Sequence, residues 1–127
     1  MRTKELLQED IKEFADQFIL DLAIPSVVGL KGTLGAGKTT LIKSFMHSLG
    51  VKENITSPTF NIVKTYRVEK LRVFHVDLYR LSSIHEFLDL DLPLNEEDTL
   101  FFIEWSDMIP ESKTKGWRFL DIEIIDE

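Results

Sequence analysis

Residues 32–40, GTLGAGKTT, hold three of the six glycines in this 127-residue chain. They fit the pattern of glycine, four residues, glycine, lysine and then serine or threonine, which is typical of phosphate-binding loops. A chain that leaves a buried strand and turns at once into a helix needs backbone angles that glycine tolerates. The exposed backbone N–H groups then converge at the positive end of the helix, where phosphate anions bind. The segment therefore predicts a site for the phosphates of a nucleotide.

The residues on both sides of this loop predict a strand before it and a helix after it. Residues 27–30, VVGL, form a short apolar run of the kind expected for a buried strand. After Lys38, apolar residues recur at helical spacing until Gly50, which is a natural C-terminal cap. A strand, a glycine loop and a helix in this order favour a phosphate-binding loop over a purely structural glycine turn.

The rest of the chain predicts helices and strands that together make an α/β domain. Two extended runs are separated only by Glu69 and Lys70, which favours a β-hairpin although this pair is a poor two-residue turn. Ser83 and Glu86 have the spacing of a capping box. In chain order, the expected elements are an amphipathic helix over residues 7–22, a strand over 27–30, a helix over 38–49, strands over 60–68 and 71–78, a short helix over 83–88, a strand over 100–105 and a half-exposed edge strand over 117–125.

These elements predict one P-loop NTPase-type domain over residues 1–127. We expect a mixed, mostly parallel central sheet flanked by helices. The β-hairpin comes before Asp77, which is the candidate for a second metal-binding acid. A chain of this length has room for a single core and little more.

The composition of the chain favours a soluble, cytoplasmic protein. It contains no cysteine, which excludes disulfide bonds and thiolate metal sites. No apolar run approaches the roughly 18 residues that span a bilayer, so we expect no membrane contact. The net charge of −7 repels phosphate backbones, so we expect no direct binding to nucleic acid. A local cationic site could still bind a nucleotide, and the acidic surface could dock onto a basic protein.

Side chains inside and beyond the loop supply candidates for phosphate and metal binding. Lys38 would reach the β- and γ-phosphates, the hydroxyl of Thr39 would coordinate Mg²⁺, and Thr40 would support the α-phosphate or simply pack. A second Mg²⁺ ligand is usually an acid at the end of a neighbouring strand, and Asp77 ends the run RVFHVD. Glu104 ends the run FFIE and could orient the attacking water or the water shell of the metal. The alternatives are a turn or capping acid at Asp77 and a buried, paired acid at Glu104.

Two other residues near these acids have competing interpretations. His75 and Asp77 share a strand face, but two ligands without a third favour a packed His75 over a transition-metal ligand. Trp105 is expected in the core, although an aromatic ring beside the nucleotide could also stack on its base. Neither residue decides the site, which depends on the glycine loop.

Four motifs occur together in this chain, namely GTLGAGKTT at residues 32–40, SPTF at 57–60, HVDLYR at 75–80 and IEW at 103–105. In this order and spacing they resemble the TsaE family, the small bacterial ATPases of tRNA threonylcarbamoyladenosine biosynthesis. The resemblance spans about residues 5–110, which is most of the chain. The glycine loop alone would match many families, whereas the four motifs together are quite specific to this one.

The resemblance implies a P-loop domain whose ATP hydrolysis serves a complex with the TsaB and TsaD proteins. That complex places the threonylcarbamoyl group on the adenosine at position 37 of tRNA. In such proteins the residues that match Lys38 and Thr39 bind phosphate and Mg²⁺, and the acid that matches Asp77 helps to hold the metal. Thr59 in the SPTF segment looks like the family's switch-type threonine near the γ-phosphate. Glu104 looks like its catalytic or metal-linked acid.

Taken with this resemblance, the residues predict ATP and Mg²⁺ as ligands and TsaB and TsaD as partners, with no direct contact to tRNA. Thr33 stands where family members often have an acid, and phosphate binding should survive because the loop binds through backbone amides. The predicted nucleotide-binding residues are Gly32, Thr33, Leu34, Gly35, Ala36, Gly37, Lys38, Thr39 and Thr40. The predicted catalytic residues are Glu104, Thr59 and Asp77, and the predicted metal ligands are Thr39, Asp77 and Glu104.

Two other functions use the same kind of loop. A small-molecule kinase needs an acceptor pocket and an arginine-rich lid, and only five arginines are scattered through this chain. A non-hydrolysing adaptor would hold nucleotide without cleaving it, so phosphate release in the presence of partners discriminates it from an ATPase. No Asn-Lys-x-Asp segment occurs to recognise guanine, which favours adenine. We expect slow hydrolysis by the isolated chain and completion of the site by a partner.

Overall fold

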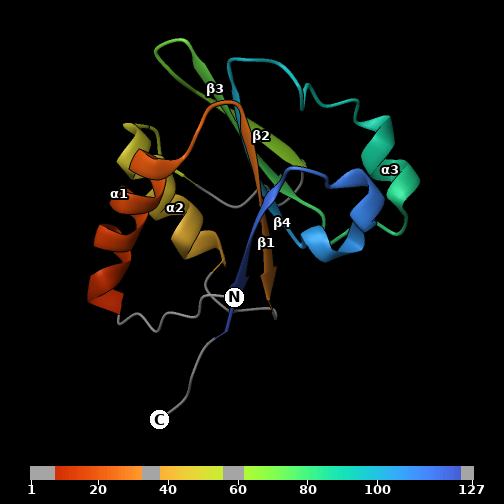
Figure 1. Ribbon diagram of the computed structural model, residues 1–127, viewed down its shortest axis with the longest axis horizontal. Coiled ribbons are helices and arrows are strands. Elements are labelled where there is room, and N and C mark those ends of the chain that lie inside the picture. Colours follow the sequence, from red (N-terminus) through yellow and green to blue (C-terminus); the bar gives the residue numbers. More distant parts are fainter. Residues whose placement is uncertain (1–7, 33–37, 56–61, 124–127) are drawn as a thin grey trace.

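The structure is a computed structural model that describes residues 8–32, 38–55 and 62–123. Within these residues it forms a sheet with helices on both faces (Figure 1). No helix in this part of the chain has the length and apolar composition that crossing a bilayer requires. In chain order the elements are η1 (Gln8–Asp10), α1 (Ile11–Asp21), β1 (Ser26–Gly32), α2 (Lys38–Leu49), β2 (Val63–Val68), β3 (Leu71–Asp77), α3 (Ile84–Asp89), β4 (Thr99–Glu104), η2 (Ser106–Met108), η3 (Glu111–Lys113) and β5 (Arg118–Ile122), where η denotes a 3-10 helix.

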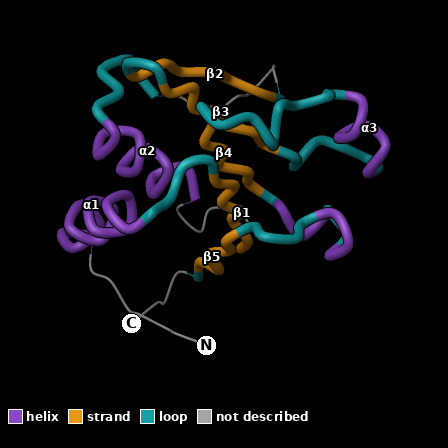
Figure 2. Tube along the Cα trace, turned by 45° about the horizontal axis from the view of Figure 1, so that its top comes forward, coloured by secondary structure: helices purple, strands orange, loops and turns teal. Residues whose placement is uncertain are grey.

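The sheet has the strand order β2-β3-β4-β1-β5. Strands β3, β4, β1 and β5 pair in parallel, and β2 pairs antiparallel with β3. This arrangement confirms the predicted mixed, mostly parallel sheet and the edge position of the last strand. Figure 2 shows α1 and α2 on one side of the strands and α3 on the other. The strand order brings the carboxyl ends of β3, β4 and β1 side by side, so residues far apart in sequence meet at one edge of the sheet.

A column of three aromatic rings ties α1 and α2 to the middle of the sheet. Phe18 of α1 stacks on Phe45 of α2 with ring centroids 4.9 Å apart, and Phe45 stacks on Phe102 of β4 at 5.2 Å. Phe45 and Phe102 are fully buried, and buried rings contribute large apolar areas to a core. The predicted helix over residues 7–22 is therefore confirmed as α1, although its first turn is the 3-10 helix η1.

The C-terminus of α2 has the cap that the sequence predicted. Gly50 has a φ of 97°, in the left-handed region that glycine adopts without steric cost. Its N–H donates to the carbonyl oxygen of His47 at 3.0 Å, and the N–H of Val51 donates to that of Met46 at 3.0 Å. This pair of bonds is a Schellman motif, which confirms Gly50 as the residue that terminates the helix.

Strands β2 and β3 form the predicted hairpin with a turn of two residues. Val68 pairs with Leu71, which leaves Glu69 and Lys70 in the turn. Glu69 takes a φ of 55°, a left-handed conformation that glycine or asparagine would adopt more readily. The loop is thus as short as the sequence spacing allowed, although its residues are not those that such turns prefer. Strand β3 ends at Asp77, so this acid lies at the carboxyl end of a strand as predicted.

Helix α3 begins after Ser83 as predicted, but the bonds that cap it differ from the expected capping box. The side chain of Ser83 makes no capping hydrogen bond. The carboxylate of Glu86 instead accepts from the backbone N–H of Ser82 at 3.3 Å and from the Ser82 hydroxyl. In a capping box, the side chains of Ser83 and Glu86 would each bond to the backbone N–H of the other residue. Here the Glu86 carboxylate alone forms the cap, through Ser82. The helix runs to Asp89, one residue beyond its predicted end.

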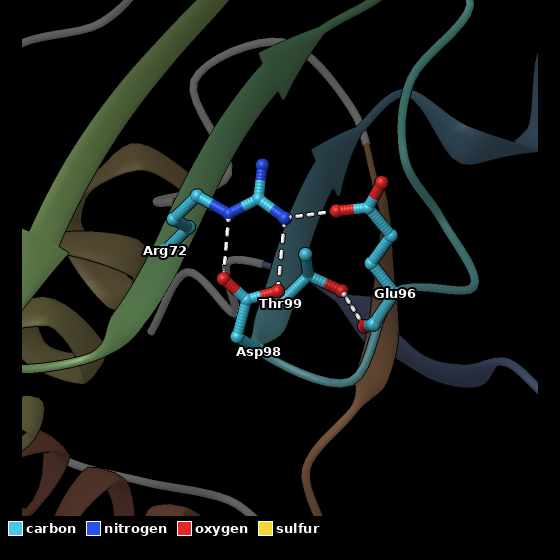
Figure 3. A network of polar contacts seen from close by, with 4 residues as sticks. All are labelled: Arg72, Glu96, Asp98 and Thr99. Atoms are coloured by element: carbon cyan, nitrogen blue, oxygen red, sulfur yellow. Dashed lines mark hydrogen bonds and ion pairs between the residues drawn. The ribbon is translucent and has the colours of Figure 1, made fainter.

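An arginine at the start of β3 holds the segment that leads into β4 (Figure 3). Arg72 Nε donates to Asp98 Oδ2 at 2.8 Å, and Arg72 Nη2 donates to Asp98 Oδ1 at 2.9 Å and also to Glu96. The hydroxyl of Thr99 donates to the carbonyl oxygen of Glu96 at 2.7 Å. Because Arg72 is also the register partner of Thr99, these contacts fix where β4 enters the sheet.

Candidate functional site

The carboxyl ends of β1, β3 and β4 and the first turn of α2 bound one region of the molecule. Strand β1 ends at Gly32 and helix α2 begins at Lys38, so the predicted strand and helix lie on either side of the loop. Gly32 has a φ of 148°, which side chains rarely adopt and glycine tolerates. Six of the predicted site residues lie outside the described residues, namely Thr33, Leu34, Gly35, Ala36, Gly37 and Thr59.

Lys38 is buried, with 5% of its surface exposed, although it carries a charge. Its Nζ donates to the carbonyl oxygen of Gly32 at 2.9 Å and lies 3.9 Å from the centroid of the Trp105 ring. Burial lowers the pKa of Lys38, and the nearby carboxylates of Glu104 and Asp77 oppose that shift. The amine thus lies between the end of β1 and the end of β4, where a phosphate-loop lysine meets its phosphates.

Glu104 is buried at the end of β4, with 3% exposed, and accepts hydrogen bonds from two elements. The hydroxyl of Thr39, in the first turn of α2, donates to Oε1 at 3.3 Å. Nε2 of His75, on β3, is 2.5 Å from Oε2, and it is the donor because an ionised carboxylate only accepts. Glu104 is therefore a buried, paired acid, and both of its partners belong to the edge where the predicted site lies. Thr40, one residue along α2, is exposed.

Asp77 ends β3 directly beside Glu104, which is its register partner on β4. Asp77 Oδ1 accepts from the backbone N–H of Tyr79 at 3.0 Å. This is the contact of a turn acid, which was the alternative interpretation of Asp77 from the sequence. Burial raises the pKa of Asp77, the bond from Tyr79 lowers it, and the charge of Glu104 raises it. A divalent cation beside Asp77 would reverse this shift, because positive charge favours the ionised carboxylate.

The donor atoms at this edge of the sheet fit magnesium. Thr39 supplies a hydroxyl and Asp77 and Glu104 supply carboxylates, which are the hard oxygen ligands that Mg²⁺ takes. Among the described residues, no three histidine, aspartate or glutamate side chains lie together so that they could hold a metal by themselves. Mg²⁺ usually binds through one or two carboxylates and completes its shell with phosphate and water, so the residues present fit it better than a transition metal. His75 is fully buried, in agreement with the packed position predicted for it.

Trp105 follows β4 in a left-handed backbone conformation, with a φ of 63°. Its backbone N–H donates to the carbonyl oxygen of Leu30 at 3.0 Å, and its ring lies 5.0 Å from that of Tyr79 between centroids. Strained backbone at a residue other than glycine is often found at functional sites. Sequence reasoning missed the contact of Trp105 with Lys38 and gave no role to Tyr79, because no local pattern links residues so distant in the chain.

Residues 7–127 match the sequence profile of one protein family, described as Threonylcarbamoyl adenosine biosynthesis protein TsaE. The chain belongs to the TsaE family. This membership confirms the resemblance that the four sequence motifs indicated. The site at the carboxyl edge of the sheet brings Lys38 and Thr39, which follow the glycine loop, together with Asp77 of the HVDLYR segment and Glu104 of the IEW segment.

Individual relatives and a solved structure agree with this assignment. The tRNA threonylcarbamoyladenosine biosynthesis protein TsaE of Rickettsia felis is 36% identical over 121 residues, which are 94% of this chain and 71% of that protein. The protein of the same name from Rickettsia bellii is 38% identical over 121 residues, which are 94% of this chain and 84% of that one. The crystal structure of Bacillus subtilis YdiB matches with a TM-score of 0.74 and 26% identity, covering 97% of this TsaE-family chain and 76% of YdiB. The predicted P-loop NTPase-type α/β fold is thereby confirmed.

Proposed function

We propose that this chain is an ATP-binding and ATP-hydrolysing subunit required for threonylcarbamoyladenosine modification of tRNA at position 37. One observation carries the proposal. Lys38 and Thr39 open α2 directly after the glycine loop, and the Thr39 hydroxyl is 3.3 Å from the buried carboxylate of Glu104. A phosphate-binding helix, a hydroxyl and an acid at the end of a neighbouring strand are the parts that P-loop ATPases combine. The names of the TsaE relatives support the link to tRNA modification.

Phosphate binding is assigned to the loop and to Lys38. The backbone N–H groups of residues 32–37 would surround the β- and γ-phosphates at the positive end of α2. Lys38 Nζ would exchange the carbonyl oxygen of Gly32 for phosphate oxygens. The exchange is favourable because a buried ammonium group gains an anion as its partner. The adjoining Thr40 would support the α-phosphate.

Metal binding and hydrolysis are assigned to the acids and to two threonines. Thr39 and Asp77 would hold Mg²⁺, which when bound neutralises charge on the phosphates. Glu104, which is buried, would accept a hydrogen bond from the attacking water or from a water on the metal. Thr59 would lie near the γ-phosphate, as the family resemblance implies.

The partner in this proposal is a complex of TsaB and TsaD. The described residues include no insertion that would form a lid over the site, so hydrolysis would be slow until a partner completes it. The net charge of −7 supports a protein–protein contact and leaves the tRNA to the partners. The working location would be the cytoplasm, where tRNA is modified.

The decisive experiment measures phosphate release from ATP by the chain alone and then with purified TsaB and TsaD. Stimulation by the partners, dependent on Mg²⁺, supports the proposal. Tight ATP binding with no phosphate release under any condition would instead indicate a non-hydrolysing adaptor. A phosphorylated metabolite as the product would indicate a small-molecule kinase.

A matched pair of lysine variants tests the binding site itself. Lys38→Ala should abolish ATP binding in a calorimetric titration, while Lys43→Ala, an exposed lysine on the same helix, should leave the affinity within about twofold. Circular dichroism establishes that both variants keep the fold. Unchanged ATP affinity in folded Lys38→Ala would contradict the assignment.

A further inference from the structure

His75 is a polar residue in an apolar layer. Its side chain is fully buried on the face of β3 that packs against α2, and its register partner on β4 is Phe102. Phe102 in turn stacks on Phe45 of α2. A hydrocarbon side chain is the ordinary occupant of such a position.

Within the part of the chain that the structure describes, one of the two ring nitrogens of His75 has a hydrogen-bond partner. Nε2 donates to Glu104 Oε2 at 2.5 Å. Nδ1 is also buried and has no hydrogen-bond partner among the described residues. A neutral imidazole that donates from Nε2 has an acceptor at Nδ1, and an acceptor buried without a donor costs stability. Among the described residues, the bond to Glu104 is therefore the polar contact that a histidine at position 75 makes and a hydrocarbon side chain would lack.

That bond fixes the orientation of a carboxylate that the site needs. Among the described residues, two side chains bond to the Glu104 carboxylate, and the contacts from Thr39, at 3.3 Å and 3.5 Å, are much longer than the one from His75. A long side chain held by a weak contact on one side would turn about its terminal bonds. His75 holds Oε2 on the β3 side, which leaves Oε1 directed towards the first turn of α2.

We propose that His75 is a positioning residue that fixes the Glu104 carboxylate in the orientation required for hydrolysis. The inference rests on the proposed ATPase function and adds a residue to it. His75 touches neither phosphate nor water in this scheme, and it acts entirely through Glu104. Partners of this kind, which orient a site residue, typically change activity by about 10- to 100-fold when removed.

Three substitutions at position 75 separate positioning from packing. His75→Gln places an amide N–H near the position of Nε2, so it should keep kcat within about threefold of the native value. His75→Asn places its amide near Nδ1, out of reach of Glu104, and His75→Phe restores the volume without a donor. Both should lower kcat about 10- to 100-fold with ATP affinity within about twofold. His75→Phe should also lower the unfolding temperature, because the buried carboxylate of Glu104 loses its shortest hydrogen bond.

A double-mutant cycle with Glu104→Gln shows whether His75 acts through the carboxylate. In the Glu104→Gln background, His75→Phe should cause no further loss of kcat. A loss that multiplies with that of Glu104→Gln would overturn the proposal. Equal activity of His75→Gln and His75→Asn would overturn it as well.

A spectroscopic measurement keeps the test independent of hydrolysis. The chain has three histidines, and His47 and His85 are exposed, so the ring nitrogens of His75 can be assigned by NMR. We expect His75 as the tautomer with hydrogen on Nε2, with a strongly deshielded, slowly exchanging proton that is lost or shifted in Glu104→Gln. Hydrogen on Nδ1 instead would refute the positioning bond. A native protein that releases no phosphate even with its partners would refute the ATPase proposal, whatever the NMR result.

Discussion

Asp77 and Glu104 are register partners on the last rung of the parallel ladder between β3 and β4, so two carboxylates project from adjacent strands on one face of the sheet. Both lie at the edge where α2 begins with Lys38 and Thr39. Like charges placed side by side repel, and the charge of Glu104 adds to the effect of burial in raising the pKa of Asp77. The arrangement is unfavourable for the isolated chain and favourable around a divalent cation.

Asp77→Asn should therefore stabilise the nucleotide-free protein while it reduces Mg²⁺-dependent turnover. Asparagine keeps the oxygen that accepts from the Tyr79 N–H and removes the charge. An acid whose pKa is raised by folding destabilises the native state above that pKa, and this cost vanishes as the pH falls below the ordinary value of 3.8. Calorimetry in EDTA should show a Tm about 2 to 4 °C higher at pH 7, with the gain shrinking towards pH 4.

The control for this prediction is Glu53→Gln, which removes an exposed acid that follows the C-terminal end of α2, whereas the site lies at the start of that helix. It should leave both Tm and turnover almost unchanged, because exposed charges contribute little. A Tm of Asp77→Asn below the native value would show that neighbouring groups already stabilise the charge of the Asp77 carboxylate without a metal. Identical turnover across a magnesium titration would remove Asp77 from the metal site.

Thr39→Val should abolish the response of hydrolysis to magnesium while it preserves the fold. Valine has nearly the shape of threonine but no hydroxyl, so it removes both the predicted metal ligand and the hydrogen bond to Glu104. We expect kcat to fall about 100-fold or more, and Thr39→Ser, which retains the hydroxyl, to stay within about tenfold. Thr40→Val is the neighbouring comparison. It should weaken ATP binding by about tenfold at most and leave the magnesium midpoint unchanged, and an equal loss in both valine variants would contradict the separate role of Thr39.

Arg72→Met should destabilise the protein without changing its binding of ATP. The guanidinium holds Asp98 through two hydrogen bonds and also contacts Glu96 (Figure 3), and it lies at the opposite end of β3 from Asp77. Such two-point contacts exceed single surface pairs, which contribute little, so we expect a loss of a few degrees in Tm with ATP affinity unchanged. Arg67→Met, at the register partner of Arg72 on β2, should have a smaller effect.

The same pair predicts a pH dependence. Hydrogen bonds from Arg72 hold the pKa of Asp98 below its ordinary value of 3.8. A carboxyl whose pKa is lowered by folding contributes stability above the ordinary value and loses it as the pH falls through the folded value. The difference in Tm between native protein and Arg72→Met should thus stay constant from pH 7 to pH 5 and shrink below about pH 4. A difference that grows on acidification would exclude Asp98 as the partner.

Local patterns were enough to predict the elements that surround the loop. The glycine spacing and the helical period after Lys38 are short-range features, and they located the end of β1 and the start of α2. Asp77 and Glu104 could be proposed because each follows an apolar run and strands end where such runs end. The order of the strands in the sheet, in contrast, depends on residues far apart in the sequence. No pattern in the sequence shows that β4 lies between β3 and β1, and that order is what makes the two acids neighbours.

Sequence reasoning missed the contacts of residues that could bind any of several partners equally well. His75 looks the same in a sequence whether its ring packs, binds metal or holds a carboxylate 29 positions later. Ser82 and Ser83 both precede α3, and only the backbone path decides that Glu86 binds the first of them. At Glu69 the tertiary structure overrides the local preference. The pairing of β2 with β3 forces a left-handed turn conformation on a residue type that disfavours it.

Gly29→Ala should destabilise the protein by about 1 to 3 kcal/mol, the usual effect of overfilling a packed site. A Cβ at position 29 of β1 would lie 2.7 Å from Ser106 Oγ and 2.8 Å from the Phe119 ring. Ser106 is 1% exposed and cannot move aside, whereas Phe119 is 41% exposed and is held by the amine of Lys31, 4.5 Å from the ring centroid. The main relief must therefore come from the ring.

Urea denaturation of a double-mutant cycle tests this explanation. Phe119→Ala alone should cost stability because it removes packing, but in the Gly29→Ala background it should cost much less, since the obstacle to the new methyl group is gone. Losses that simply add would place the strain at Ser106 instead. Because β1 runs directly from position 29 to Gly32, whose carbonyl oxygen holds Lys38, the single variant should also weaken ATP binding, and Phe119→Ala should restore part of that affinity.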